Sequence, residues 1–224
     1  MITLSKLAAF GTTILPVVSA VSGKTFTGWD CCKPACAWSA TVPQGTSGTA
    51  HVCDINNNLL GNGPLAKSGC DNGGTGYLCD SYAPVPVSDN LSYGFAVMMA
   101  SNDCCKCYQL TWTSGQAAGK QMIVQAINVG SPSGSVGAND IVVLTPGGGV
   151  GPNSAGCRNQ YGTSWGQQNG GVSDRTACAN LPSNLQGGCY WRFNWADGDI
   201  NGWNIDYQQV SCPGRLTSIS GCSG

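Results

Sequence analysis

Fourteen cysteines constrain the fold of this 224-residue chain more than any other feature of its sequence. An even number of cysteines in an exported chain is typical of a disulfide framework, here of up to seven bridges. Zinc binding is the competing interpretation, but the spacing from Cys104 to Cys107 is unusual for zinc ligands and His51 is the only histidine. We therefore expect disulfide-stapled loops, with no metal or other cofactor. The cysteines are residues 31, 32, 36, 53, 70, 79, 104, 105, 107, 157, 178, 189, 212 and 222.

The first twenty residues predict an export signal. Lys6 provides a positive start, residues 7–18 form an apolar run, and Val18-Ser19-Ala20 is a small-residue cleavage site. The run is too short and too interrupted for a bilayer span, and a buried N-terminal helix is the alternative interpretation. We therefore expect residues 1–20 to be a signal peptide and the protein to be a secreted, extracellular monomer with no membrane partner.

The charged residues exclude several classes of function. The net charge is −1 and there is no basic stripe, so nucleic acid is not an expected partner. A hydrolase with a Ser-His-Asp triad would have to use His51, and no Gly-x-Ser-x-Gly motif accompanies it. All eleven acidic residues are Asp, so the two carboxylates that glycosidic cleavage requires would both be aspartates. Seven Trp and seven Tyr residues could stack on sugar rings, with core packing as the alternative for each.

The periodicity predicts a mainly β protein. Residues 21–28 are interpreted as a short lead-in and residues 39–90 as long loops. One short helix is expected between an N-cap at Ser173 and the stop at Pro182. We expect a small closed barrel in a single domain over residues 21–224, without a carbohydrate-binding module. The predicted strands are Tyr93–Ala100, Cys107–Thr113, Met122–Asn128, Asp140–Leu144, Cys189–Trp195 and Ile205–Ser211.

The strip Trp29–Trp38 reads Trp-Asp-Cys-Cys-Lys-Pro-Ala-Cys-Ala-Trp and closely resembles the N-terminal signature of the endoglucanases of glycoside hydrolase family 45. The resemblance covers nearly the whole chain after the predicted signal, including its cysteine pattern. It implies a six-stranded double-psi β-barrel with few short helices, an open groove, and inverting hydrolysis of internal β-1,4-glucosidic bonds. The other matching motifs are Lys67–Cys70, Cys104–Tyr108, Leu110–Gly115, Ala118–Lys120, Pro146–Gly151 and Gly188–Phe193.

The resemblance also implies roles for single residues. Asp30 matches the general base, although a carboxylate that only caps nearby amides is the alternative. Trp38 matches a tryptophan that stacks on glucose, and Lys33 lies in the same signature, where it can contact sugar hydroxyls. We count Trp29 and Gly148 with them as predicted substrate-binding residues, since glycines such as Gly148 let a backbone approach a ligand. The expected partner is therefore a β-1,4-glucan.

Departures from the family pattern concern the second carboxylate. Val142 stands where the family has its general acid, and Asp140 stands where it has a histidine. Gly28 replaces a tyrosine, and Ser135 replaces a loop aspartate. Asp140 could serve as the acid if a bulge shifted it by about 6–7 Å along its strand, which is two residues.

The alternative is that the acid is lost. The protein would then be a weak hydrolase, or a non-hydrolytic polysaccharide binder similar to expansins, which share this barrel. A third hypothesis is a disulfide-stapled secreted protein without a sugar ligand. The first hypothesis remains a secreted endo-β-1,4-glucanase, with Asp30 as base and Asp140 as acid.

Overall fold

The computed structural model describes residues 20–224, so most of the predicted signal peptide lies outside the described residues. No helix in this part of the chain has the length and apolar character to cross a membrane. The strands are β1 Val21–Gly28, β2 Val85–Pro86, β3 Leu91–Met98, β4 Cys107–Trp112, β5 Gln121–Val129, β6 Ile141–Leu144 and β7 Trp203–Val210. The α-helices are α1 Ala155–Tyr161, α2 Ser183–Asn194 and α3 Gly214–Ser220, and short 3₁₀ turns lie between these elements.

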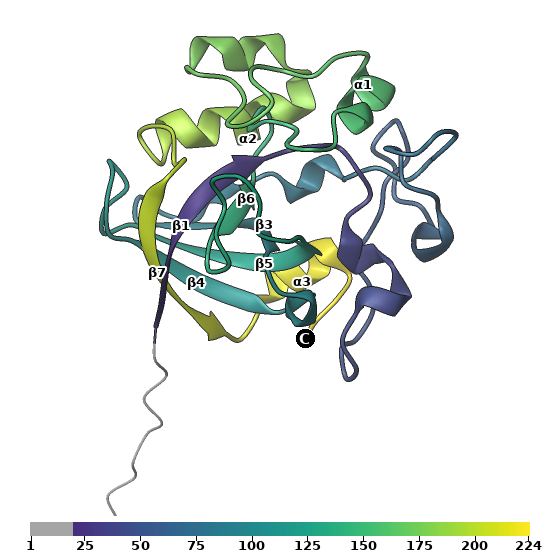
Figure 1. Ribbon diagram of the computed structural model, residues 1–224, viewed down its shortest axis with the longest axis horizontal. Coiled ribbons are helices and arrows are strands. Elements are labelled where there is room, and N and C mark those ends of the chain that lie inside the picture. The colour runs from purple at the N-terminus through teal and green to yellow at the C-terminus, as the bar shows by residue number, and fades with distance from the viewer. Residues whose placement is uncertain (1–19) are drawn as a thin grey trace, which may run out of the picture.

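Six of these strands close into a barrel, which confirms the predicted fold class (Figure 1). The order around it is β3-β5-β4-β7-β1-β6, and β6 returns to pair with β3. Two pairs are parallel, β1 with β6 and β3 with β5, and the others are antiparallel. Closure leaves no free sheet edge among these six strands, and the short β2 pairs only with β3.

The segment interpreted as a lead-in is instead the first barrel strand, β1. Its inward-facing residues are Thr25 and Thr27, both buried. The Thr25 hydroxyl donates to the carbonyl of Ile200 at 2.7 Å and accepts the indole N–H of Trp112 at 3.0 Å. Because hydrogen bonds rather than apolar side chains satisfy this face, apolar alternation could not reveal the strand.

The predicted strand Cys189–Trp195 is wrong, because these residues belong to helix α2 and its C-terminal cap. The residues buried at its interface include Leu185, Gly188, Cys189 and Arg192, which is the i, i+3, i+4, i+7 spacing of one helical face. The predicted strand began at Cys189, so the alternating pattern on which it rested did not include Leu185 and Gly188. In Figure 1, α1 and α2 lie together beside the end of the barrel where β1 finishes.

All fourteen cysteines pair in seven disulfides, as predicted. Long loops between β1 and β3 are stapled by these bridges. The expected helix after Ser173 is a 3₁₀ segment, Thr176–Asn180, rather than an α-helix. Its start is capped by the carboxylate of Asp174, which accepts the backbone N–H groups of Thr176 and Ala177 at 2.9 and 3.2 Å.

Candidate active site

Three disulfides anchor the Trp29–Trp38 strip to distant parts of the chain. They join Cys31 to Cys157 in α1, Cys32 to Cys70, and Cys36 to Cys104. Cys31 has a φ of 61°, a left-handed conformation that is uncommon outside glycine. The bridges therefore hold a tightly turned backbone directly after Asp30.

Asp30 is half-buried, and each of its two carboxylate oxygens accepts one hydrogen bond from the protein. One oxygen accepts the backbone N–H of Cys32 at 2.9 Å, and the other accepts the side-chain amide of Asn153 at 3.1 Å. Burial nevertheless raises the pKa of Asp30 above its ordinary value of 3.8, and these two hydrogen bonds offset only part of that rise. Neither of the two salt bridges within residues 20–224 involves Asp30. A carboxylate with a raised pKa and no cationic partner is suited to accept a proton.

Helix α1 can approach Asp30 closely because residue 156, which faces it, is a glycine. A Cβ at Gly156 would lie only 2.3 Å from the Asp30 carbonyl oxygen and 2.6 Å from the sulfur of Cys70. Asn153 lies two residues before α1 and reaches the carboxylate from there. The sequence contained no pattern that distinguishes Asn153 from the chain's many other asparagines, so this residue was missed.

The triple-glycine segment forms a backbone wall beside the strip. The N–H of Trp29 donates to the Gly149 carbonyl at 2.6 Å, and the Thr27 hydroxyl donates to the Gly148 carbonyl at 2.9 Å. Gly148 is buried, and a Cβ there would lie within 3.0 Å of Thr27 and of two backbone atoms. The Trp29 side chain is only 2% exposed, so its indole packs inside the molecule and offers no face to solvent.

A second network supports this wall from behind. Asn201 accepts the N–H of Thr27 through its side-chain oxygen at 2.7 Å. The buried guanidinium of Arg192 lies 2.8 Å from a carboxylate oxygen of Asp199, in a contact poorly aligned for a hydrogen bond. Arg192 also donates to the carbonyl of Gly147 at 3.4 Å. These partners come from helix α2 and the turn before β7, which sequence spacing alone could not bring together.

Lys33 and Trp38 form a cation–π pair. The Lys33 ammonium lies 3.2 Å from the centroid of the Trp38 ring and donates to the carbonyls of Pro64 and Ala66, both at 2.9 Å. Lys33 is only 5% exposed, and burial lowers the pKa of its ammonium. Trp38 is 36% exposed. Of the two, therefore, Trp38 presents a surface to solvent, while Lys33 is buried and pairs with the Trp38 ring.

The structure does not bring Asp140 to Asp30. The two Asp140 oxygens accept the backbone N–H groups of Lys24 and Gly137, both at 2.7 Å. Lys24 is four residues before the end of β1, whereas Asp30 is two residues beyond it. Four strand residues span about 13 Å, so the Asp140 carboxylate lies beside the middle of β1, whereas Asp30 lies past the end of that strand. Asp140 is 9% exposed and closes the loop before β6.

Val142 lies nearer to Asp30, on an apolar patch. It is aligned with Phe26 on β1 and with Val97 on β3, and all three side chains are half-buried. A Cβ on Gly28 would lie 2.9 Å from a methyl group of Val142, so the missing side chain at residue 28 leaves Val142 uncovered. The position at which the family resemblance expects an acid therefore carries a hydrocarbon next to two others.

Comparison with known proteins agrees with this architecture. The sequence model described as glycosyl hydrolase family 45 matches residues 22–223. Relatives include a putative endoglucanase type K of Fusarium oxysporum, 42% identical over 92% of this chain, and an endoglucanase of Phaedon cochleariae, 37% identical over 94%. The chain spans about half (54%) of the Fusarium protein and 88% of the Phaedon protein.

A solved structure is similar over nearly its whole length. The cellulase of the Antarctic springtail, Cryptopygus antarcticus, superposes with a TM-score of 0.81 and 36% sequence identity, covering 92% of this chain and 98% of the springtail chain. A family model that matches residues 22–223 of this chain, on a closed barrel with seven disulfides, is decisive for the classification. The chain belongs to glycosyl hydrolase family 45.

Proposed function

We propose that this protein is a secreted endo-β-1,4-glucanase that binds a β-glucan chain along the Trp29–Trp38 strip and cleaves it slowly, with inversion. The observation that carries the proposal is Asp30, a half-buried carboxylate with a raised pKa and no cationic partner. In this proposal Asp30 activates the attacking water, and Trp38 stacks on a glucose ring. Names of the relatives, endoglucanase and cellulase, support the substrate class.

The remaining predicted residues support the site in this proposal. Lys33 positions the Trp38 ring from below, and Trp29 and Gly148 keep the backbone beside Asp30 in place. Asp140 holds the loop before β6 through two backbone N–H groups, so in this proposal it does not donate a proton to the leaving oxygen. Loss of general acid catalysis typically lowers a rate by about 10²–10⁴-fold.

A second candidate function is favoured by Val142. A barrel that retains Asp30 and Trp38 but carries a hydrocarbon at the acid position would bind β-glucan without hydrolysing it. Such a protein would act like an expansin, loosening contacts between polysaccharide chains. Both candidates use the same ligand and the same strip, and they differ only in turnover.

Restoring the acid is the experiment that separates them. We expect Val142→Asp to increase the rate at which the protein thins a soluble β-1,4-glucan, by about tenfold or more. Because Phe26 and Val97 flank residue 142, burial will raise the pKa of the new carboxyl, as a general acid requires. The matched control is Val142→Asn, because asparagine has nearly the shape of aspartic acid but its amide cannot act as a general acid.

Companion variants test the roles of the two aspartates by the same viscosity measurement. Asp30→Asn should abolish thinning, whereas Asp140→Asn should lower stability but leave residual thinning measurable. If neither the wild type nor Val142→Asp thins the glucan while both still bind it, the non-hydrolytic function replaces the first proposal. If Asp140→Asn abolishes thinning in a folded protein, the proton comes from Asp140 after all.

A further inference from the structure

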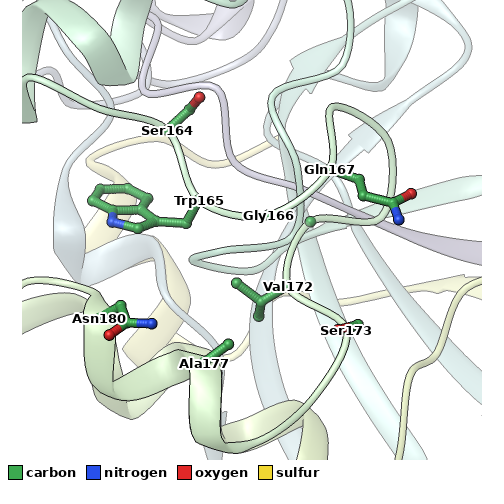
Figure 2. Close-up of a pocket in the computed structure, with 9 residues that line it drawn as sticks. Ser164, Trp165, Gly166, Gln167, Val172, Ser173, Ala177 and Asn180 are labelled. Atoms are coloured by element: carbon green, nitrogen blue, oxygen red, sulfur yellow. The ribbon is translucent and has the colours of Figure 1, made fainter.

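A cleft of about 300 Å³ lies outside the Trp29–Trp38 strip, on the segment between α1 and α2 (Figure 2). Its volume is at the lower end of the range of small-ligand sites. None of its lining residues is charged, so it lacks the groups that bind an anionic or cationic ligand. The lining residues are Ser164, Trp165, Gly166, Gln167, Gly171, Val172, Ser173, Ala177 and Asn180.

We call this hollow the Trp165 cleft, because the side chain of Trp165 forms one side of it. Its indole is half-exposed, and the ring of Tyr161 braces it at a centroid distance of 5.5 Å. Figure 2 shows the indole facing Asn180 and Ala177 across the cleft, with Val172 beside them. An aromatic face bordered by amides and hydroxyls offers both contacts that a neutral sugar ring needs, an apolar platform for its C–H face and partners for its hydroxyl groups.

The cleft is pre-formed, because its loop is closed by backbone hydrogen bonds. Gln167 and Gly171 exchange both N–H···O bonds, at 2.9 and 3.1 Å. Gly166 has a φ of 72°, and a Cβ there would lie 2.1 Å from a backbone atom of Gly171. On the opposite side, Cys178 is bonded to Cys189 and ties the Ala177–Asn180 turn to α2. A rigid cleft loses little conformational entropy when a ligand binds.

The same loop is joined to the wall beside Asp30. Gln168 and Gly151 are linked by two hydrogen bonds, from Gly151 N–H at 2.8 Å and from the Gln168 amide at 2.7 Å. Val172 N–H donates to the Gly147 carbonyl at 2.8 Å. Since Gly149 in turn accepts the N–H of Trp29, a continuous backbone network runs from the Trp165 cleft to the strip.

We propose that the Trp165 cleft is a second sugar-binding site, which takes a glucosyl unit of a neutral β-1,4-glucan. Trp165 stacks on the sugar ring, and the side chain of Asn180 bonds its hydroxyls. The identity of the ligand rests on the proposed function, whereas the site itself rests on the cleft. A glucan held at both places would remain attached to the protein between cleavage events, which raises the effective concentration of chain at Asp30.

Fluorine NMR of the full chain labelled with 5-fluorotryptophan tests the two sites separately. The background is Asp30→Asn, which prevents hydrolysis, and the probe is cellotetraose. Trp165→Phe and Trp38→Phe assign the two resonances. We expect cellotetraose to shift both signals, and we expect the Trp165 signal to shift still when Trp38 is replaced by Ala.

Retention on insoluble cellulose provides a second readout. Trp165→Ala should weaken binding to cellulose about tenfold, because the variant loses one aromatic contact that the bound sugar would cover. Trp165→Phe, which keeps a ring in the cleft, should retain most of the affinity. Leu65→Ala, at a side chain that is 85% exposed, is the surface control and should bind as the wild type does. Thermal unfolding checks that each variant is folded.

The outcomes distinguish the two proposals. A shift at Trp38 with an unchanged Trp165 signal would overturn the second site and leave the proposed function standing. Shifts at Trp165 that vanish with Trp38→Ala would show that the cleft does not bind by itself, which also overturns it. If neither signal responds and cellulose retains none of the variants, both proposals fail.

Discussion

At the scale of single residues, Asn153 adjusts the proton affinity of Asp30. Its amide donates to the carboxylate at 3.1 Å and lowers the pKa, against the larger effect of burial. Removing this donor by Asn153→Ala should therefore raise the pKa of Asp30 further. Because the base works only when ionised, activity is lost as pH falls through that pKa. We expect the acidic limb of the wild-type profile of kcat/KM to lie above pH 3.8, and that of the variant to lie higher still.

Viscosity rates measured from pH 3 to 8 check this prediction, with Val142→Asp as the background if the wild type is too slow. Asn139→Ala, on the exposed loop before β6, is the matched control and should leave the profile in place. An acidic limb that stays at the same pH in Asn153→Ala would mean that Asp30 is not the group whose ionisation limits the rate.

The roles of Asp30, Trp38 and Lys33 remain predictions, but the sequence describes the surroundings of Asp30 more fully than those of Lys33, because most partners of Asp30 are local. Asp30 is held by groups within its own strip and by one asparagine, so the signature already describes its surroundings. Lys33 is buried because the carbonyls of Pro64 and Ala66 meet its ammonium. Those partners lie 31 and 33 residues further along an irregular loop, where no periodicity indicates contact. Lysine side chains are usually exposed, so only the tertiary structure shows that Lys33 is buried.

At the scale of elements, the strands were predictable where their inward faces are apolar. β3, β4, β5, β6 and β7 overlap the predicted runs, whereas β1 buries threonines and was missed. Helix α2 was missed for a different reason. Trp191 and Trp195 lie on one helical face and stack at 5.4 Å, close to Trp112 in the barrel. Aromatic residues at i and i+4, flanked by others, imitate the alternation of a strand when only seven residues are read.

Two adjacent glycines in α2 allow a matched test of how this helix packs. A Cβ at Gly188 would lie 2.7–2.8 Å from Ala83 and Pro146, whereas a Cβ at Gly187 would meet no atom within 4 Å. Replacing either by Ala favours the helix by about 1 kcal/mol. Gly188→Ala also overpacks the interface, at a cost of about 1–3 kcal/mol. We therefore expect Gly187→Ala to be stabilising by about 0.5–1 kcal/mol and Gly188→Ala to be destabilising.

Urea unfolding of the oxidised protein measures both changes. Viscosity rates add a functional readout, because Pro146 precedes the glycines that form the wall beside Asp30. If Gly188→Ala were as stable as Gly187→Ala, α2 would not be packed against Pro146 as tightly as the structure places it.

At the scale of the whole molecule, the disulfides divide into long and short closures. Cys31–Cys157 joins residues 126 apart and fixes the turn after Asp30, whereas Cys178–Cys189 joins residues 11 apart beside the Trp165 cleft. All four side chains are fully buried. Replacement by Ala therefore leaves similar cavities in both cases, and the comparison isolates the length of the loop.

Loop entropy predicts a larger loss of stability for the long bridge. Considered without the other bridges, Cys31–Cys157 contributes about 5 kcal/mol and Cys178–Cys189 about 3 kcal/mol to the free energy of unfolding. Cys36–Cys104 remains in place and shortens the longer loop to roughly 60 residues. The expected difference between Cys31→Ala/Cys157→Ala and Cys178→Ala/Cys189→Ala is therefore about 1.5 kcal/mol, measured by equilibrium unfolding in denaturant. The first double variant should also slow glucan thinning more than the second, since it releases the backbone next to Asp30. Equal losses of stability would show that strain and cavities, rather than chain entropy, govern how this framework is stabilised.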